Sequence, residues 1–288
     1  MLTPYSVNVT SFGDALNSLD IIIDAFKSKG LLVIKGHRFS QDEQIALTEA
    51  MGDVLDWNFH TGTADITDDA SSPRSAIYPG GHSDQENRDY STQGKDDYVL
   101  DWHIEQVFYV DPILAGVWNM TLFTADRGNG NTRFVDSTVL YSMLSTDDQE
   151  FLDQAVVKWE KPMGSGTGPF YTKVVDIHPV TSDKTLRVET DHGCYVMPHL
   201  VQWAGSEPTA EQVSRYDKLW EWLKSQLNTN EDIRHVQEWQ EADLLVVDLF
   251  RMYHSVMGGF KFGERQFTGI GVRPRNATSE LYLELGAL

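Results

Sequence analysis

Short strands bounded by turn residues dominate the chain after residue 99. Their segments are rich in β-branched and aromatic residues and are separated by Gly, Asp, Asn or Ser. One helix, near 208–228, interrupts them; it opens with a Thr209–Gln212 capping box and continues with apolar residues at helical spacing. Many short strands with few helices predict a mostly β fold with flanking helices, built as an antiparallel sandwich or barrel such as a jelly roll. The segments are YVLDWHIEQ, ILAGVWNMTLFTA, TRFVDS, YTKVVDIHPV, TLRVET, DLLVVDLFRMYHSV and RQFTGIGVRP.

The first 100 residues follow a different pattern. Residues 1–55 predict helix, strand and helix: the first helix stops at Gly30, the strand LLVIKG follows, and a Ser40–Glu43 capping box starts the second helix. Residues 56–100 form a long polar segment, which in a compact domain is usually a lid or a binding loop. We predict one domain over residues 1–288, with 56–100 as a lid or substrate loop and 101–288 as the core with its helical insert.

Composition excludes several classes of protein. The formal net charge of −20 repels phosphate backbones, so a small-molecule substrate is a better expectation than nucleic acid. No apolar run approaches the roughly 20 residues that span a bilayer, and the N-terminus lacks the features of a secretory signal. Cys194 is the single cysteine, which excludes an intrachain disulfide and a cysteine-based zinc site. A cytoplasmic protein without a membrane partner is predicted; the sequence does not predict an oligomeric state.

The segment DWHIEQVF places His103 and Glu105 two residues apart in an apolar and aromatic run. In a strand, residues i and i+2 point to the same face, so the imidazole and the carboxylate would project side by side. Such a pair supplies two of the three ligands of a non-haem iron site, or it is a plain hydrogen-bonded pair. The two residues alone leave both interpretations open.

A third ligand has to come from a distant strand. His254 is the best candidate, because we expect it to end a strongly apolar strand just before a Gly–Gly loop. His178, His192 and His199 carry no partner signal and are expected to be structural. His82 and Asp84 form a rival pair, but they lie in a Gly- and Ser-rich loop that holds ligands less rigidly than a strand.

Several ordered motifs together resemble one family. They are AFKSKGLLVIKGHRFSQDEQIALTEAMG, DWHIEQVF, GNGNTRFVDS, DIHPVTSDKTLRV and DLLVVDLFRMYHSV followed by GERQFTGIGV. Their order resembles the Fe(II)/2-oxoglutarate-dependent dioxygenases of the taurine dioxygenase-like superfamily, which includes the clavaminate synthase-like enzymes. The resemblance implies a double-stranded β-helix (jelly-roll) core and an oxidoreductase that uses Fe(II), 2-oxoglutarate and O2.

The resemblance also assigns residues to the iron and the co-substrate. It implies that His103, Glu105 and His254 are the iron ligands. Glu replaces the commoner Asp, as in clavaminate synthase-like enzymes, many of which act on amino acids; related halogenases lack the carboxylate. Thr132 and Arg265 match the residues that bind the distal carboxylate of 2-oxoglutarate, and a guanidinium with a hydroxyl suits that group.

The expected substrate contacts depart from those of taurine dioxygenase. There, an arginine four residues after the co-substrate arginine holds the sulfonate, and that position here is Gly269. Arg273, on the same expected strand face, is the reserve candidate for the co-substrate. The substrate is expected to contact residues of the 56–100 segment, with four candidates: Trp57, His60, Arg74 and Tyr78.

The predicted function is hydroxylation of an unactivated C–H bond in a small molecule such as an amino acid or its derivative, with release of succinate and CO2. Two alternatives stay open from the sequence. The same three ligands could serve a zinc-dependent hydrolase, because metal selection depends on geometry and availability. The fold could also serve a non-catalytic small-molecule-binding protein.

Overall fold

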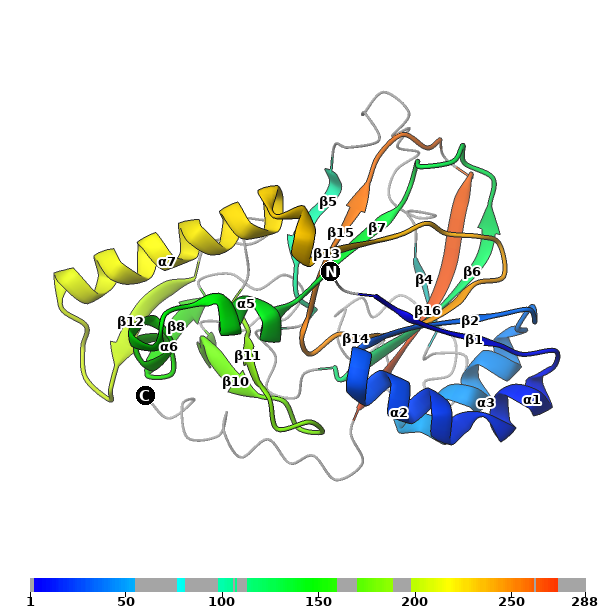
Figure 1. Ribbon diagram of the computed structural model, residues 1–288, viewed down its shortest axis with the longest axis horizontal. Helices are drawn as coiled ribbons and strands as arrows, with labels where there is room; N and C mark the ends of the chain where they lie inside the picture. The colour runs from blue at the N-terminus through cyan, green and yellow to red at the C-terminus, as the bar shows by residue number, and fades with distance from the viewer. Residues whose placement is uncertain are drawn as a thin grey trace, which may run out of the picture.

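The computed structural model describes residues 3–54, 77–80, 98–105, 107, 113–159, 170–188, 198–261 and 263–273, and of 77–80, 98–99 and 170 only the backbone. Within these ranges the chain is mostly strands with some helices, as predicted (Figure 1). No helix in the described ranges is both long enough and apolar enough to cross a membrane.

The N-terminal helix–strand–helix unit forms where the sequence predicts it. Helix α2 ends at Gly30, whose φ of 66° is left-handed and therefore favours glycine. Both halves of the Ser40–Glu43 capping box are present at the start of α3. A short strand and a short helix precede this unit. The elements are β1 (Tyr5–Asn8), α1 (Phe12–Asn17), α2 (Leu19–Lys29), β2 (Leu31–Lys35) and α3 (Gln41–Met51).

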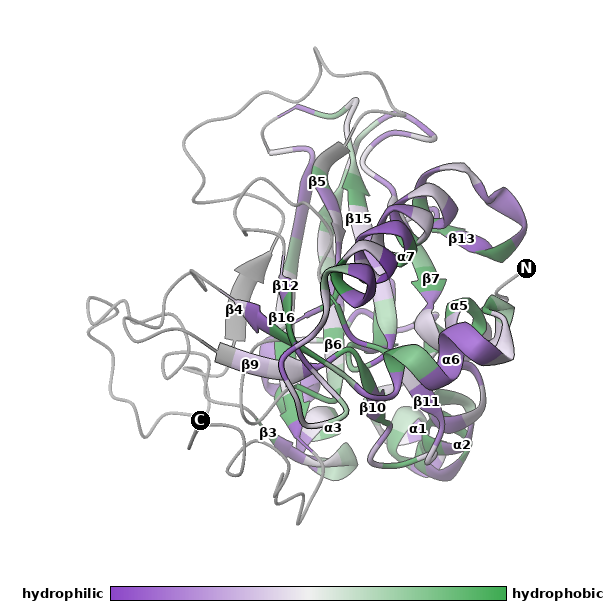
Figure 2. Cartoon of the chain, turned by 90° about the vertical axis from the view of Figure 1, so that its left-hand side faces the viewer, coloured by the Kyte–Doolittle hydropathy of each residue, from purple (hydrophilic) through white to green (hydrophobic). Residues whose placement is uncertain are grey.

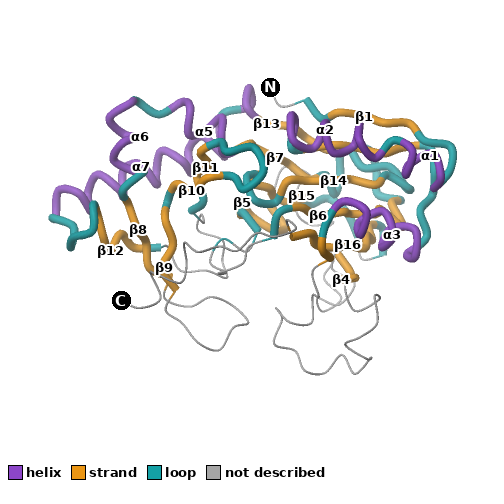
Figure 3. The backbone as a smooth tube through the Cα atoms, turned by 90° about the horizontal axis from the view of Figure 1, so that it is seen from below, coloured by secondary structure: helices purple, strands orange, loops and turns teal. Residues whose placement is uncertain are grey.

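The larger sheet joins both ends of the chain. Its strand order is β1-β2-β14-β6-β16-β3, with β4 paired to β16. Neighbouring strands are antiparallel except β1 and β2, which are parallel. Helices α1, α2 and α3 gather on one side of this sheet (Figures 1 and 3). The further strands are β3 (Asp53–Val54), β4 (Ile77–Gly80), β6 (Ala115–Phe123), β14 (Leu244–Asp248) and β16 (Arg265–Arg273).

The smaller sheet has four antiparallel strands in the order β13-β7-β15-β5. Its strands are β5 (Tyr98–His103), β7 (Thr132–Asp136), β13 (Arg234–Gln237) and β15 (Met252–Met257). The segment DLLVVDLFRMYHSV, predicted as one strand, is therefore two strands in two different sheets. A turn at 249–251 separates them, and the Asp248 carboxylate accepts a hydrogen bond from the Phe250 backbone N–H there.

A third region packs beside the two sheets. The expected helix near 208–228 is α7 (Ala210–Thr229), and both halves of its Thr209–Gln212 capping box are present. The prediction of a single helix among the strands was wrong, because two short helices follow β7, each capped by an acidic or hydroxyl side chain. The other elements are α5 (Ser137–Met143), α6 (Thr146–Leu152), β8 (Ala155–Trp159), β9 (Phe170–Lys173), β10 (Val175–Ile177), β11 (Lys184–Leu186), β12 (His199–Trp203) and a 3₁₀-helix (Glu231–Ile233). Strands β12, β8 and β9 form a sheet, and β10 pairs with β11.

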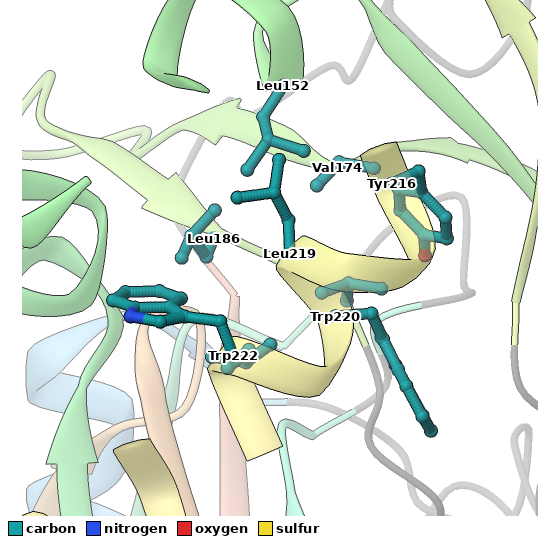
Figure 4. A pocket seen from close by; sticks show the side chains of 9 residues that line it. Leu152, Val174, Leu186, Tyr216, Leu219, Trp220 and Trp222 are labelled. Atoms are coloured by element: carbon teal, nitrogen blue, oxygen red, sulfur yellow. The ribbon is translucent and has the colours of Figure 1, made fainter. Parts of the chain in front are cut away.

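Helix α7 is amphipathic and covers an apolar core. Its hydrophobic side faces the neighbouring strands, and its polar side faces outward (Figure 2). A cavity of about 10 Å³ lies beneath it, lined by aliphatic and aromatic side chains such as Leu152, Leu186 and Trp220 (Figure 4). A space of that size holds at most about one water and has no convergent polar groups, so this cavity is a packing defect rather than a ligand site.

Buried charges join the β14–β15 turn to the rest of the fold. Arg251 Nε lies 3.1 Å from Asp248 Oδ2, and Arg251 Nη1 lies 3.7 Å from Asp136 Oδ2. His178 Nδ1 accepts two backbone N–H hydrogen bonds, so its ring proton is on Nε2, which lies 2.9 Å from Asp248 Oδ2. Gly30 makes room for this cluster: an added Cβ there would lie 2.6 Å from Arg251 Nη2. The network therefore fixes the turn from which β15 starts.

Replacing Arg251 with Met tests this role. Removing one partner of a buried ion pair leaves the other charges uncompensated, so we expect the free energy of unfolding to fall by about 3–5 kcal/mol. Urea unfolding of the whole chain measures the change. The matched control is Arg38→Met, since Arg38 pairs with Glu241 at the surface and its side chain is 62% exposed; a change of at most about 1 kcal/mol is expected there. Equal losses in the two variants would contradict the assigned role.

Candidate metal centre

Two histidines face each other across neighbouring strands of the smaller sheet. His254 on β15 is directly opposite His103 on β5, and the two ring centroids are 4.0 Å apart. Directly opposite residues on antiparallel strands bring their side chains this close whenever both point to one face. Both histidines are buried. The expectation that His254 ends its strand was wrong: it is the third residue of β15 and so is held by hydrogen-bonded neighbours on both sides.

Backbone carbonyls set the orientation of both imidazoles. His103 Nδ1 lies 2.8 Å from the Asp101 carbonyl oxygen, and His254 Nδ1 lies 3.3 Å from the Met252 carbonyl oxygen. A carbonyl only accepts, so each Nδ1 carries the proton and each Nε2 carries the lone pair. This tautomer is the one in which Nε2 can bind a metal, with the second nitrogen hydrogen-bonded to fix the ring.

Glu105 completes the group from a turn rather than from the strand. Strand β5 ends at His103, so the prediction that both residues share one strand face was wrong. The turn still brings the carboxylate to the histidines: Glu105 Oε2 lies 3.7 Å from His254 Nε2. Its side chain is 25% exposed, and removal from water raises the pKa of Glu105 to about 7. An unpaired carboxylate is therefore costly here until a cation joins it.

The three side chains can form a metal site. One ligand atom each from His103, Glu105 and His254 lies within 4.8 Å of the others. Two imidazoles and a carboxylate are the donor set of non-haem Fe(II) oxygenases, which bind the metal on one face and leave other positions for substrates. The donor types, their convergence and the Nδ1 hydrogen bonds all fit that metal.

Aromatic side chains pack against the His–Glu–His group. Trp118 lies on β6 of the larger sheet, with its ring centroid 5.4 Å from that of His254. Phe134 on β7 stacks on the same imidazole with a centroid distance of 6.0 Å, and its ring centroid lies 6.1 Å from that of Trp118. Trp118 is buried, so it belongs to the core and also borders the candidate site. Such a wall lowers the local polarity and restricts water around the ligands.

Thr132 and Arg265 meet beside the histidines. Val256, two residues after His254, is paired with Thr132 on β7. Arg265 begins β16 and reaches across from the larger sheet: its Nη2 donates to Thr132 Oγ1 at 3.2 Å, and its Nε donates to the Gly130 carbonyl at 3.0 Å. Arg265 is only 2% exposed. Burial lowers the pKa of its guanidinium to about 10, so the group remains a cation at neutral pH.

Gly130, two residues before Thr132, lets the Arg265 side chain lie close to the backbone. Gly130 has a φ of 64°, which favours glycine, and an added Cβ there would lie 3.3 Å from Arg265 Cδ. No carboxylate oxygen of the described residues forms an ion pair with Arg265. A buried guanidinium whose described partners are a carbonyl and a hydroxyl still has charge to be neutralised, so its chemistry suits an anionic ligand.

The reserve candidate, Arg273, is not brought to this point. Arg273 is at the far end of β16, eight residues from Arg265, and pairs in register with Asp53; eight strand residues span about 26 Å. Gly269 lies between them, opposite Trp118. Trp57, His60, Arg74, His82, Asp84 and His192 lie outside the described residues. Of Tyr78 only the backbone is described, and it pairs with Gly269.

Two histidines expected to be structural lie outside the three-residue group. His178 is buried against Asp248, away from the three-residue group, and His199 is exposed on β12. Sequence reasoning missed one neighbour, Trp239, whose indole N–H donates to Thr132 Oγ1 at 2.9 Å. It precedes β14 in a loop, and its contact with Thr132 spans 107 positions, so no local pattern could reveal it.

Removing either histidine tests the metal site. Each of His103→Ala and His254→Ala deletes one of three ligands, and we expect either change to abolish stoichiometric Fe(II) binding. Metal content after anaerobic loading and desalting measures this directly. His199→Ala is the control and is expected to retain one iron per chain. Full loading of both ligand variants would place the metal elsewhere.

The chain matches a family model in sequence and solved proteins in structure. Residues 2–270 match the family model of the taurine catabolism dioxygenase TauD, TfdA family. No curated protein matches the chain in sequence. Structural similarity extends over most of the chain, and at these low identities it establishes the fold alone.

Three solved structures illustrate this similarity. A taurine dioxygenase from Burkholderia xenovorans has a TM-score of 0.66 and 14% identity, covering 95% of this chain and 90% of its own. AAD-2, solved in complex with Mn(II) and N-oxalylglycine, has a TM-score of 0.63 and 16% identity, covering 96% and 97%. PvcB, an Fe, alpha-ketoglutarate dependent oxygenase from an isonitrile synthetic pathway, has a TM-score of 0.65 and 14% identity, covering 95% and 88%.

The family match spans nearly all of the described chain, including the His–Glu–His group and the buried pair Thr132 and Arg265. It confirms the enzyme class predicted from the sequence, an Fe(II)/2-oxoglutarate-dependent dioxygenase, with iron as cofactor and 2-oxoglutarate as co-substrate. The chain therefore belongs to the taurine catabolism dioxygenase TauD, TfdA family.

Proposed function

We propose that His103, Glu105 and His254 are the iron ligands and that Thr132 and Arg265 bind the distal carboxylate of 2-oxoglutarate. The proposed reaction is hydroxylation of an unactivated C–H bond in a small molecule, with release of succinate and CO2. When bound, the iron would activate O2 and couple the oxidation of 2-oxoglutarate to that of the substrate. The chain's own residues hold the two reactants in place and restrict water around them.

One observation carries this proposal: the buried Arg265–Thr132 pair lies beside the His–Glu–His group. The partners of Thr132 and Phe134 on β15 are Val256 and His254, and diagonal neighbours on antiparallel strands are about 7–8 Å apart. A five-carbon dicarboxylate is long enough to join an anion receptor to a metal over that distance. A hydrolase that needs only zinc and water has no use for the buried cation, so the oxoacid explains more of the site.

The arrangement of the two sheets supports a jelly-roll core. The ligands and the co-substrate threonine come from β5, β7 and β15 of the smaller sheet, whereas Arg265 and Trp118 come from β16 and β6 of the larger one. Their side chains meet between the sheets. We propose that these sheets form a double-stranded β-helix within a single domain over residues 1–288, with the site inside it.

The substrate is proposed to be an amino acid or a related small molecule rather than a sulfonate. Gly269 lies on the face of β16 that carries Arg265 and Phe267, opposite Trp118. A glycine there supplies no fixed positive charge for an anionic headgroup. Glu105, in place of the commoner aspartate, favours the clavaminate synthase-like branch. The predicted contacts with Trp57, His60, Arg74 and Tyr78, and the role of residues 56–100 as a substrate loop, stay predictions, as does a cytoplasmic location.

Replacing each of the two β16 arginines separates the co-substrate anchor from its reserve. Arg265→Ala removes a buried guanidinium that pairs with a carboxylate, a loss of about 2–5 kcal/mol. The dissociation constant of 2-oxoglutarate is therefore expected to rise about 30-fold to several thousand-fold, with iron binding retained because no ligand is changed. Arg273→Ala is expected to leave both constants nearly unaltered. Anaerobic titration of 2-oxoglutarate into the Fe(II)-loaded variants measures them.

A large loss in Arg273→Ala with none in Arg265→Ala would overturn the assignment and the inference from Gly269 with it. Release of succinate tests the substrate class once the co-substrate is placed. We expect candidate amino acids to stimulate succinate release above the level without substrate, and taurine to give no stimulation. Stimulation by taurine alone would contradict the proposed substrate class.

A further inference from the structure

The hydroxyl of Thr132 has an unusual set of partners. Thr132 is only 1% exposed. Its hydroxyl oxygen accepts two hydrogen bonds, from Trp239 Nε1 at 2.9 Å and from Arg265 Nη2 at 3.2 Å. Neither an indole N–H nor a guanidinium can accept a hydrogen bond. Both interactions therefore use the lone pairs of the threonine oxygen.

These two hydrogen bonds leave the Thr132 hydroxyl hydrogen available only for donation to a further acceptor. A threonine hydroxyl has one hydrogen to donate and two lone pairs with which to accept. Two donors fill the two lone pairs, and within the described chain no acceptor takes the hydrogen. A buried donor without a partner is costly, so the site favours a ligand that brings an acceptor to this hydrogen.

We propose that Trp239 is a positioning residue for the oxoacid co-substrate: by donating to Thr132, it commits the threonine hydroxyl to donate its hydrogen to the carboxylate. The inference rests on the proposed role of Thr132 and Arg265 as the co-substrate receptor. Without the indole N–H, Thr132 would keep one lone pair open, and its hydroxyl could turn to other orientations. A carboxylate, which only accepts, would then lose part of the complementary arrangement.

The surroundings of Trp239 make its hydrogen bond separable from its bulk. The ring centroid of Trp239 lies 5.9 Å from the Arg265 guanidinium, and the residue is only 3% exposed. Together with Asn131 and Phe123, it also lines a surface pocket. Truncation to alanine would therefore join that pocket to the receptor and remove a ring that faces the cation. Phenylalanine keeps a ring next to the guanidinium and removes only the N–H and part of the indole.

The first experiment is calorimetric titration of the Mn(II)-loaded whole chain with 2-oxoglutarate and with 2-oxopentanoate, which lacks the distal carboxylate. We expect Trp239→Phe to raise the dissociation constant of 2-oxoglutarate about 3- to 10-fold, the size of one neutral hydrogen bond, and to leave that of 2-oxopentanoate unchanged. An equal rise for both ligands would show a general packing defect, and no rise for either would also overturn the proposal.

A matched control exists elsewhere in the chain. Trp159 Nε1 also donates to a buried threonine hydroxyl, Thr172 Oγ1, at 2.8 Å, between the neighbouring strands β8 and β9. Trp159→Phe therefore removes the same kind of bond away from the receptor. We expect it to leave the affinity for 2-oxoglutarate unaltered, and a loss as large as that of Trp239→Phe would contradict a specific role.

A double-mutant cycle tests the route through Thr132. In a Thr132→Val background there is no hydroxyl to orient, so Trp239→Phe is expected to cause no further loss of 2-oxoglutarate affinity. An undiminished loss there would place the effect elsewhere. Arg265→Ala distinguishes the two levels of failure: if it too leaves 2-oxoglutarate binding intact, the proposed receptor itself is wrong, whereas a strong loss with an inert Trp239→Phe overturns this inference alone.

Discussion

The pairing of β15 with both of its neighbours is the constraint on which the site depends. His254 is held opposite His103 on one side and opposite Phe134 on the other, and the same register puts Val256 opposite Thr132. A slip of one residue would turn every side chain of β15 to the opposite face of the sheet. His254 would then leave the face that carries His103 and Thr132, so one register holds the proposed metal ligands and the proposed co-substrate threonine together.

That register begins at a turn built from buried charges. Asp248, at the end of β14, accepts from the Phe250 backbone and pairs with Arg251, which leads directly into β15. The turn moves the chain from the larger sheet to the smaller one. Buried ion pairs are poor sources of net stability, but they are costly to break, so they select one geometry over its alternatives. We interpret the cluster as the device that determines where β15 starts.

Local signals in the sequence predicted the parts of the fold that depend on local chemistry. Gly30 ends its helix, and the capping boxes at Ser40 and Thr209 start theirs, because each requires only residues within one turn. The long apolar run before His254 was misleading for the same reason. Leu249 and Phe250 carry the apolar pattern into the turn because both are buried there, so the apolar pattern alone did not reveal the change of sheet.

The candidate site shows a similar division. His103, Glu105 and His254 were predicted from the sequence, and the structure brings them together, although Glu105 reaches the group from a turn and His254 from the middle of a strand. The pairing of Thr132 with Arg265 followed from a family resemblance, because 133 positions separate them. Trp239 escaped both routes. A hydrogen bond that orients another hydroxyl leaves no trace in spacing or composition, and it becomes visible only when every donor and acceptor is counted.

Glu105 and Arg265 carry opposite charges in this site, and burial disfavours the charged form of both. Burial raises the pKa of Glu105 to about 7, which disfavours its anionic form, and it lowers the pKa of Arg265 to about 10, which disfavours its cationic form. Each charge is therefore costly until a group of opposite charge joins it. In the proposed function, iron would offset the cost of the carboxylate and the oxoacid would offset that of the guanidinium. Since Thr132 stands between the guanidinium and Trp239, the direction of its one hydrogen determines whether the second ligand finds a complete set of donors or an incomplete one.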